Sequence, residues 1–372
     1  MDFELSEAQE QLRDGLRRFL ASEAPLAQLR AQLDDPRGHS ASLWKGLAEL
    51  GLPGLLVPER FGGAGLGMLE MGVALEELGR ALAPAPFWSS ALAATSLVQA
   101  LASEEQQAQL LPRLAAGELV CGIAQAEATH SDWRSGATSA RRADGAWRLE
   151  GCKQPVFDAL AADALLVVAR DEELAAPAVF LCEAGAAGVE REPLPGVDGS
   201  RKQGRVRFAA ARALRLGRGD ASAGIEAALD RARLGLVADA LGAAQRAFEL
   251  ALDYARVRVQ FERPIGSFQS VQHLLVEMLQ ALELARAGLY YGLWAADHAD
   301  ARELARAAAM ANAHASAEFP RIGAEAIQIF GGVGFTWEYD VHLYYKRLLS
   351  FEHALGGPSR ELERLAAIVL DA

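Results

Sequence analysis

Residues 254–272 read YARVRVQFERPIGSFQSVQ, and residues 328–339 read QIFGGVGFTWEY. Both stretches adjoin long Ala- and Leu-rich runs with helical spacing, which cover residues 225–257, 271–298 and 301–330. A further helical pattern begins at Tyr339. The sequence therefore predicts a helical C-terminal part, in which the two quoted stretches lie where long helices end.

The rest of the chain divides into a helical segment and a segment of strands. Helical spacing begins at Leu5 and continues to about residue 115; it opens with Ser6 and Gln9 as a capping box, and the run FGGAGLG at 61–67 breaks it. Between about 118 and 215, short apolar runs alternate with turn residues. Strands confined to the middle argue against a doubly wound nucleotide-binding fold. We expect an α+β, mainly α fold with parts at 1–117, 118–218 and 219–372.

Composition and charge exclude several classes of protein. The 372 residues are 51% hydrophobic and 23% charged, enough for a large core and unlike a disordered or fibrous chain. The net charge of −12 disfavours nonspecific binding to nucleic acid or anionic membranes. The most apolar stretch, ALAADALLVVA at 159–169, falls short of the roughly 20 residues of a membrane span. The start resembles no signal peptide, and the cysteines and histidines lack metal-site spacing, so we expect a cytoplasmic protein without metal.

Four stretches together resemble the FAD-dependent acyl-CoA dehydrogenases. They are the two quoted above, LSEAQEQLRDGLRRFL at 5–20, and PERFGGAGLG at 58–67 with the following Glu76-Glu77-Leu78-Gly79. They cover nearly the whole chain in the family order, whereas GGVG alone would be an ordinary turn. The resemblance implies an N-terminal helical domain, a middle β domain and a C-terminal four-helix bundle, assembled as a dimer or tetramer. It also implies an acyl-CoA substrate, FAD held between β domain and bundle, and electron-transfer flavoprotein as oxidant.

In this family the adenine and pyrophosphate end of each FAD is bound largely by the neighbouring subunit. The residues that match those contacts are Arg258, Phe261, Gln269, Gln328, Gly331 and Gly332. A guanidinium grips a diphosphate, an aromatic ring packs on the cofactor, and glycine lets the backbone approach phosphate. Taken singly, these residues have ordinary alternatives: an Arg on a solvated helix face, a core Phe, and a glycine pair that ends a helix. The complete set at family spacing favours FAD.

The family base is missing from both of its known positions. Members remove a proton next to the thioester carbonyl with a glutamate, while a hydride passes to the flavin. The usual position of that glutamate matches Leu355, and the position used by a minority matches Ala232. Neither side chain accepts a proton, so the catalytic residue of this chain is unknown. Glu352 and His353, within one turn of Leu355, are weak candidates for a relocated base, the alternative being ordinary polar residues at a helix end.

The expected β domain departs from the family pattern as well. The acidic stretch of the type Thr-Glu-Pro-Gly-x-Gly-Ser-Asp becomes QAEATHSD at 125–132, and only Ser131-Asp132 is kept. The strand Lys-x-Trp-Ile-Thr-Asn becomes KQPVFD at 153–158, so Pro155 and Phe157 replace the Trp and Thr that meet the flavin. A proline also removes a donor from the strand ladder.

Three residues match family positions on the substrate side: Ser131, Asp230 and Arg233. For Asp230 and Arg233 the alternative is a pair near a helix N-terminus. In that arrangement the macrodipole favours the aspartate, and the arginine is solvated on the next turn.

The departures have a direction, because positions serving a neighbour's FAD are kept and positions serving this chain's own flavin and base are altered. This predicts one half of a two-gene enzyme, a heterodimer or α2β2 tetramer, whose homologous partner brings the base. Some bacterial members that act on steroid side-chain CoA thioesters resemble this arrangement. The alternatives are a complete homo-oligomeric enzyme with a relocated base, a flavin oxidase or monooxygenase, and a non-catalytic structural subunit.

Overall fold

The structure is a computed structural model that describes residues 5–128 and 132–370. Contacts divide the chain into two compact units. We call residues 32–71 and 84–232 the sheet unit, and residues 1–31, 72–83 and 233–372 the helical unit. Helices dominate, and the strands of the main sheet lie in the middle of the chain, as the sequence predicted. A two-stranded hairpin between two long C-terminal helices was not predicted. The division into three parts stays a prediction.

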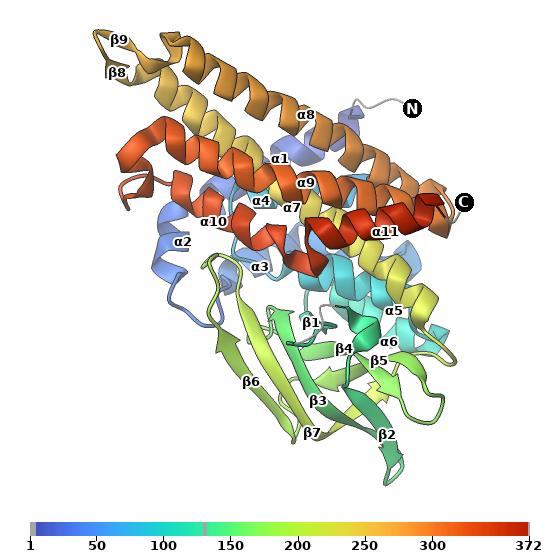
Figure 1. Cartoon of the computed structure of the whole chain (residues 1–372). Helices are drawn as coiled ribbons and strands as arrows, with labels where there is room; N and C mark the ends of the chain where they lie inside the picture. The colour runs from blue at the N-terminus through green and yellow to red at the C-terminus, as the bar shows by residue number, and fades with distance from the viewer. Residues whose placement is uncertain (1–4, 129–131, 371–372) are drawn as a thin grey trace. The chain divides into compact units, whose positions relative to one another are not determined.

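The sheet unit combines short helices with a seven-stranded sheet (Figure 1). The strands are β1 (Cys121–Ala124), β2 (Ser139–Ala143), β3 (Ala146–Phe157), β4 (Ala164–Asp171), β5 (Ala176–Glu183), β6 (Val189–Leu194) and β7 (Gln203–Arg215). Their order is β1-β4-β2-β3-β7-β5, and β5 also pairs with β4, so five strands close into a barrel. Apolar side chains such as Leu149, Val167 and Phe180 fill its core.

The helical segments that lie wholly within the sheet unit precede β1 in the sequence, apart from one short turn between β1 and β2. They are α3 (Ala41–Glu49), η1 (Leu52–Gly54), η2 (Glu59–Phe61), the π-helix η3 (Trp88–Ala94), α5 (Thr95–Leu101), α6 (Glu104–Ala115) and the short turn η4 (Trp133–Ser135). α2 (Leu26–Gln32) and α4 (Met68–Arg80) run from one unit into the other. η1 and η2 flank the predicted break at the glycine-rich run.

The ladder between β3 and β7 is interrupted at Pro155, as a missing backbone donor requires. Lys153 pairs with Val206 and Val156 pairs with Gly204, so Gln154 and Pro155 together face a single residue. This is a β-bulge, in which one strand carries an extra residue. The expected disturbance of strand pairing at this proline is therefore confirmed.

The helical unit is built around three long helices, α7 (Ser222–Val257), α8 (Gln269–His298) and α9 (Ala301–Phe330). The sequence predicted each within a few residues. α1 (Glu7–Glu23) opens with the predicted capping box, because Ser6 accepts from the N–H of Gln9 and Gln9 accepts from the N–H of Ser6. The remaining elements are β8 (Val259–Gln260), β9 (Arg263–Pro264), η5 (Ile265–Ser267), η6 (Gly331–Phe335), α10 (Val341–Glu352), η7 (Ala354–Gly356) and α11 (Pro358–Leu370).

Two glycines let α4 and α7 touch backbone to backbone. A Cβ on Gly79 would lie 1.8 Å from the carbonyl oxygen of Asp239, and one on Gly242 would lie 1.8 Å from that of Glu76. A buried ion pair, Arg347 Nη1 to Asp239 Oδ1 at 2.8 Å, lies beside this crossing. Gly79 of the motif Glu-Glu-Leu-Gly is therefore required by packing.

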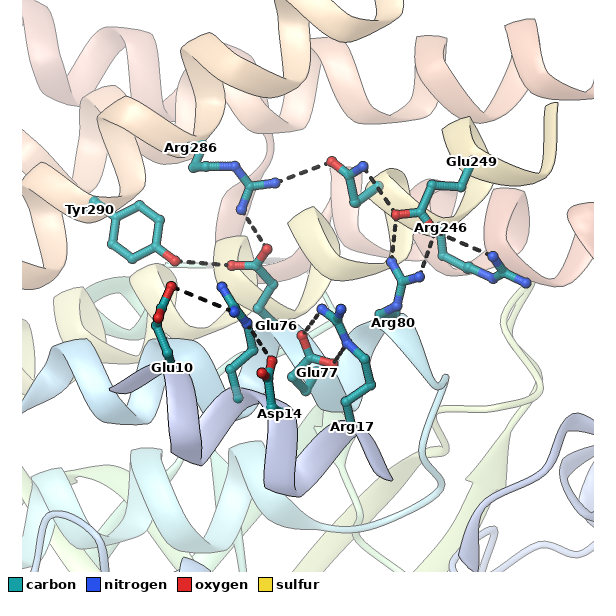
Figure 2. Close-up of polar contacts among 12 residues, drawn as sticks. Glu10, Asp14, Arg17, Glu76, Glu77, Arg80, Arg246, Glu249, Arg286 and Tyr290 are labelled. Atoms are coloured by element: carbon teal, nitrogen blue, oxygen red, sulfur yellow. Dashed lines mark hydrogen bonds and ion pairs between the residues drawn. The ribbon is translucent and has the colours of Figure 1, made fainter. Parts of the chain in front are cut away.

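Charged side chains of α1, α4, α7 and α8 line a cavity of about 400 Å³ in the helical unit. Figure 2 shows the polar contacts among them. Arg17 of α1 binds Glu77, Arg286 of α8 binds Glu76 at 2.5 Å, and Arg80 of α4 binds Glu249 of α7 at 2.5 Å. Burial opposes ionisation of Glu249, but the hydrogen bonds and charge of Arg80 lower its pKa. Among the described residues, no helix has both the length and the apolar composition to cross a bilayer.

Candidate functional site

The two stretches that dominate the sequence meet at one end of the helical unit. The ring of Tyr254 in α7 stacks on that of Phe330 in α9, with centroids 4.2 Å apart and planes 13° apart. Tyr339 meets both rings edge-on, at 6.0 and 5.3 Å. The β8–β9 hairpin lies beyond the same end of α7, where Figure 1 labels it next to the start of α8. Residues 254–272 and 328–339 thus form one surface.

The six residues that match the family's FAD contacts are all exposed, and we call them the clamp surface. They are Arg258, Phe261, Gln269, Gln328, Gly331 and Gly332. The guanidinium of Arg258 makes no ion pair or hydrogen bond with the part of the chain that the structure describes. Phe261 is 86% exposed, so the alternative that it is a core residue is wrong.

The tip of the hairpin holds Phe261 outward at a backbone cost. Phe261 and Glu262 have φ of +51° and +67°, the left-handed region that residues other than glycine rarely adopt. The pairs Val259–Pro264 and Gln260–Arg263 fix this turn on either side. Arg263 lies over the ring of Phe268, 4.1 Å from its centroid, and Phe268 meets Phe261 edge-on. Strained, exposed aromatic residues of this kind are a feature of binding sites.

Gly331 ends α9 with φ +66°, as the helix-ending alternative predicted, and its backbone is also accessible. A Cβ added at Gly331 or at Gly332 would meet no atom within 4 Å. Open backbone, an unpaired guanidinium and an exposed ring fit the diphosphate and adenine of FAD. The clamp surface therefore has the chemistry that the cofactor needs.

In the sheet unit, the positions expected to meet the chain's own flavin serve packing instead. Phe157 is buried and meets Trp88 edge-on, with centroids 5.2 Å apart. Trp88 Nε1 donates to the carbonyl oxygen of Ala232 at 2.8 Å, and Ala232 is fully buried. Pro155 is exposed in the bulge of β3. No hydroxyl or indole donor stands at either position of this strand.

The sequence comparison overlooked Glu127, which forms an ion pair with Lys153 in the sheet unit. Lys153 is buried, and its Nζ lies 2.9 Å from Glu127 Oε1. Glu127 also accepts from the backbone N–H of Ala137 and of Thr138. Burial raises the pKa of Glu127, but the hydrogen bonds outweigh it and lower the pKa to about 2. The available signal was that Lys153 follows the apolar Trp147 and Leu149 at alternate positions of the strand, because a buried ammonium needs a counter-ion.

The candidates for a relocated base lie at an ordinary helix end. Glu352 is the half-buried last residue of α10, and His353 after it is exposed. Leu355 follows in η7 with φ +58°. The role of Glu352 or His353 as a relocated base stays a prediction.

The substrate-side candidates have different outcomes. Ser131 lies outside the described residues. Asp230 is buried, and because α7 begins at Ser222, the expectation that Asp230 stands near a helix N-terminus is wrong. Arg233 is 3% exposed and its Nε lies 3.2 Å from Glu361 Oε1, so the alternative of a solvated arginine is wrong as well. Their role toward a substrate stays a prediction.

Comparisons with known proteins identify the family. The N-terminal domain of acyl-CoA dehydrogenases matches residues 6–118, and the C-terminal domain matches residues 223–370. The acyl-CoA dehydrogenase IpdE2 of Mycobacterium tuberculosis is 31% identical over 98% of both chains. The chain therefore belongs to the acyl-CoA dehydrogenase family, whose members use FAD.

Two solved structures are similar over nearly the whole chain. The ChsE4–ChsE5 complex from Mycobacterium tuberculosis is 27% identical, with a TM-score of 0.91 over 100% of both chains. A variant of the Tcur3481–Tcur3483 steroid ACAD is 30% identical, with a TM-score of 0.90 over 98% of both chains. The fold is that of the family: N-terminal helices, a central β barrel and a C-terminal helical domain.

Proposed function

We propose that this chain is the base-lacking subunit of a heteromeric acyl-CoA dehydrogenase and that it clamps the FAD of a homologous partner. The complex carries out α,β-dehydrogenation of an acyl-CoA thioester. When bound, FAD supplies the acceptor for the hydride. The partner carries the glutamate base, and electron-transfer flavoprotein reoxidises the flavin, as the family resemblance implies. This chain's own residues bind the adenine and pyrophosphate end.

One observation carries the clamp part of the proposal: all six clamp residues are exposed on the single chain. Arg258 has an unpaired guanidinium, and Phe261 exposes 86% of its surface on a strained turn. A group that held this chain's own cofactor would have other parts of the same chain around it. An outward clamp serves a ligand that arrives with another subunit.

The positions for chemistry support the same division of labour. Leu355 and Ala232 stand at the two family base positions and hold no ionisable group. Phe157 packs on Trp88 where the family presents a threonine to the flavin. Because two similar structures are named as pairs of chains, one of them a steroid ACAD, we propose a steroid side-chain CoA thioester as the substrate class.

The deciding experiment measures FAD per chain, from flavin absorbance, for the chain alone and for the chain co-expressed with an acyl-CoA dehydrogenase encoded beside it. We expect little FAD alone, and FAD together with dehydrogenase activity in the mixed complex. Near one FAD per chain in the isolated protein, with turnover, would instead identify a complete homo-oligomeric enzyme. Glu352→Gln and His353→Gln would then locate its base. A mixed complex that forms without flavin or activity would identify a purely structural subunit.

A matched pair of variants tests the clamp. Arg258→Ala removes the unpaired guanidinium, and we expect the flavin content of the mixed complex to fall. Arg256→Ala is the control, because Arg256 lies two residues before Arg258 in the last turn of α7, is exposed, and already pairs with Asp253 at 3.5 Å. Equal flavin content in the two variants would remove Arg258 from the clamp.

A further inference from the structure

Three aromatic residues are exposed at alternate positions from the last residue of η6 onward. Phe335 is 68% exposed, Trp337 is 60% exposed, and Tyr339 is 36% exposed. We call these three residues the aromatic strip. Large apolar side chains that are exposed close together are a feature of interaction surfaces.

Trp337, in the middle of the strip, is held by its neighbours. The guanidinium of Arg30 lies 5.5 Å from the ring centroid, and the ammonium of Lys346 lies 5.1 Å from it. His342 meets the ring edge-on at 4.9 Å. Arg30 in turn donates to Asp340 Oδ1 at 2.7 Å and to the carbonyl oxygen of Tyr339 at 3.0 Å. These contacts restrict the rotamer of an exposed ring, which lowers the entropy lost when a partner covers it.

The aromatic strip reaches the same helix end that carries the clamp surface. Tyr339, the third residue of the strip, also contacts Tyr254 and Phe330 beneath the clamp surface. The strip is therefore continuous with the surface assigned to the partner's FAD.

We infer that Trp337 is the anchor on which the FAD-carrying partner subunit docks, an inference that rests on the proposed function. Rigid exposed Trp residues flanked by Arg are typical centres of interface energy. Lys346 forms no ion pair with a residue that the structure describes, whereas Arg30 is already paired with Asp340. The complementary partner surface thus presents an apolar pocket for the indole and a carboxylate for Lys346.

The test compares two Trp→Ala variants of the full chain. Trp337→Ala should raise the Kd for the partner at least about 30-fold, the loss typical of a hot-spot residue. Trp294→Ala is the matched control, because Trp294 lies near the far end of α8 from the hairpin, and its Kd should stay within about 3-fold of wild type. Trp337→Phe should recover part of the affinity, since it keeps a ring between the two cations. Lys346→Glu should weaken binding and reverse its salt dependence.

The outcomes separate the inference from the proposed function. If the wild-type chain binds no partner and carries its own FAD, the proposed function fails. If the wild-type complex forms and Trp337→Ala binds like Trp294→Ala, only the anchor is wrong. If Trp337→Ala instead dissociates a homo-oligomer of this chain, the molecule that docks on Trp337 is a second copy of the chain, and the inference is overturned. If Trp337→Ala lowers the melting temperature of the chain, the other two variants decide. Unchanged affinity for the partner in both Trp337→Phe and Lys346→Glu would overturn the inference.

Discussion

Arg17 and Glu77 form a two-point ion pair that joins α1 to α4. Arg17 Nη2 lies 2.6 Å from Glu77 Oε1 and its Nε lies 2.8 Å from Oε2, as Figure 2 shows. Glu77 is buried, whereas Arg17 is half-exposed. The hydrogen bond to Glu77 raises the pKa of Arg17 above its usual value. The pair connects the first helix to the motif Glu-Glu-Leu-Gly.

Glu77→Gln should lower the free energy of unfolding by about 1–2 kcal/mol, because the buried half of a charged, two-point hydrogen bond is lost. The half-exposed Arg17 then turns to solvent, which keeps the loss moderate. Urea denaturation is the measurement. Lys45→Gln, which breaks an exposed pair with Glu49, is the control and should change stability by less than about 0.5 kcal/mol. Equal effects would show that α1 is held by other contacts.

Acid should weaken the chain through Glu127. Its folded pKa of about 2 lies below the usual value of about 4.3, so the unfolded chain binds the proton more readily. This stabilisation of the folded chain is fully present above about pH 5 and is lost as the pH falls from 5 toward 2. It amounts to at most ~3 kcal/mol. Thermal melting from pH 7 to 3 measures it. Glu127→Gln should flatten this acid limb; an unchanged limb would assign it to other carboxylates.

Alanine at Gly79 or Gly242 should destabilise the helical unit strongly. Each new Cβ would lie 1.8 Å from a carbonyl oxygen of the facing helix, so the backbones must separate, at a cost of roughly 1–3 kcal/mol or more. Gly288→Ala is the control, because a Cβ there meets nothing within 4 Å. In α8 this change should stabilise by about 0.5–1 kcal/mol. Opposite signs in urea denaturation are the expected result.

Glu361→Gln tests what holds Arg233. Glu361 is fully buried between Arg233 at 3.2 Å and Arg364 at 3.6 Å. Removing its charge breaks the ion pairs of a buried carboxylate, which should lower the free energy of unfolding by about 1–3 kcal/mol. Glu363→Gln, exposed on the same helix, should have little effect. If Glu361→Gln left the melting temperature unchanged and altered only acyl-CoA binding, Arg233 would be a substrate residue rather than a structural one.

The long helices and the barrel could be predicted from sequence because their signals are local. Periodicity set α7, α8 and α9, and short apolar runs between turns located β3, β4, β5 and β7. Pro155 also predicted the disturbance of strand pairing at its position, because a residue without a backbone N–H cannot donate to the ladder.

Side-chain partners far apart in sequence could not be predicted in this way. Arg233 was expected to be a substrate residue or a solvated arginine, and its neighbour Glu361 lies on α11, whose packing no local pattern gives. Phe261 shows the same limit, because its exposure depends on a turn in the left-handed region at two successive residues. Phe side chains are usually buried in folded proteins, and only the conformation of this turn exposes Phe261.

The contact of α4 and α7 at Gly79 and Gly242 removes the clearance that lets packed helices slide. Within the helical unit, α4 and α7 therefore behave as one rigid element. Tyr254, which stacks on Phe330 under the clamp surface, lies near the C-terminal end of α7. Glu76 and Glu77 of α4 line the charged cavity. A shift of α7 at its Tyr254 end would therefore move α4 with it and, through the pair of Glu77 and Arg17, α1 as well.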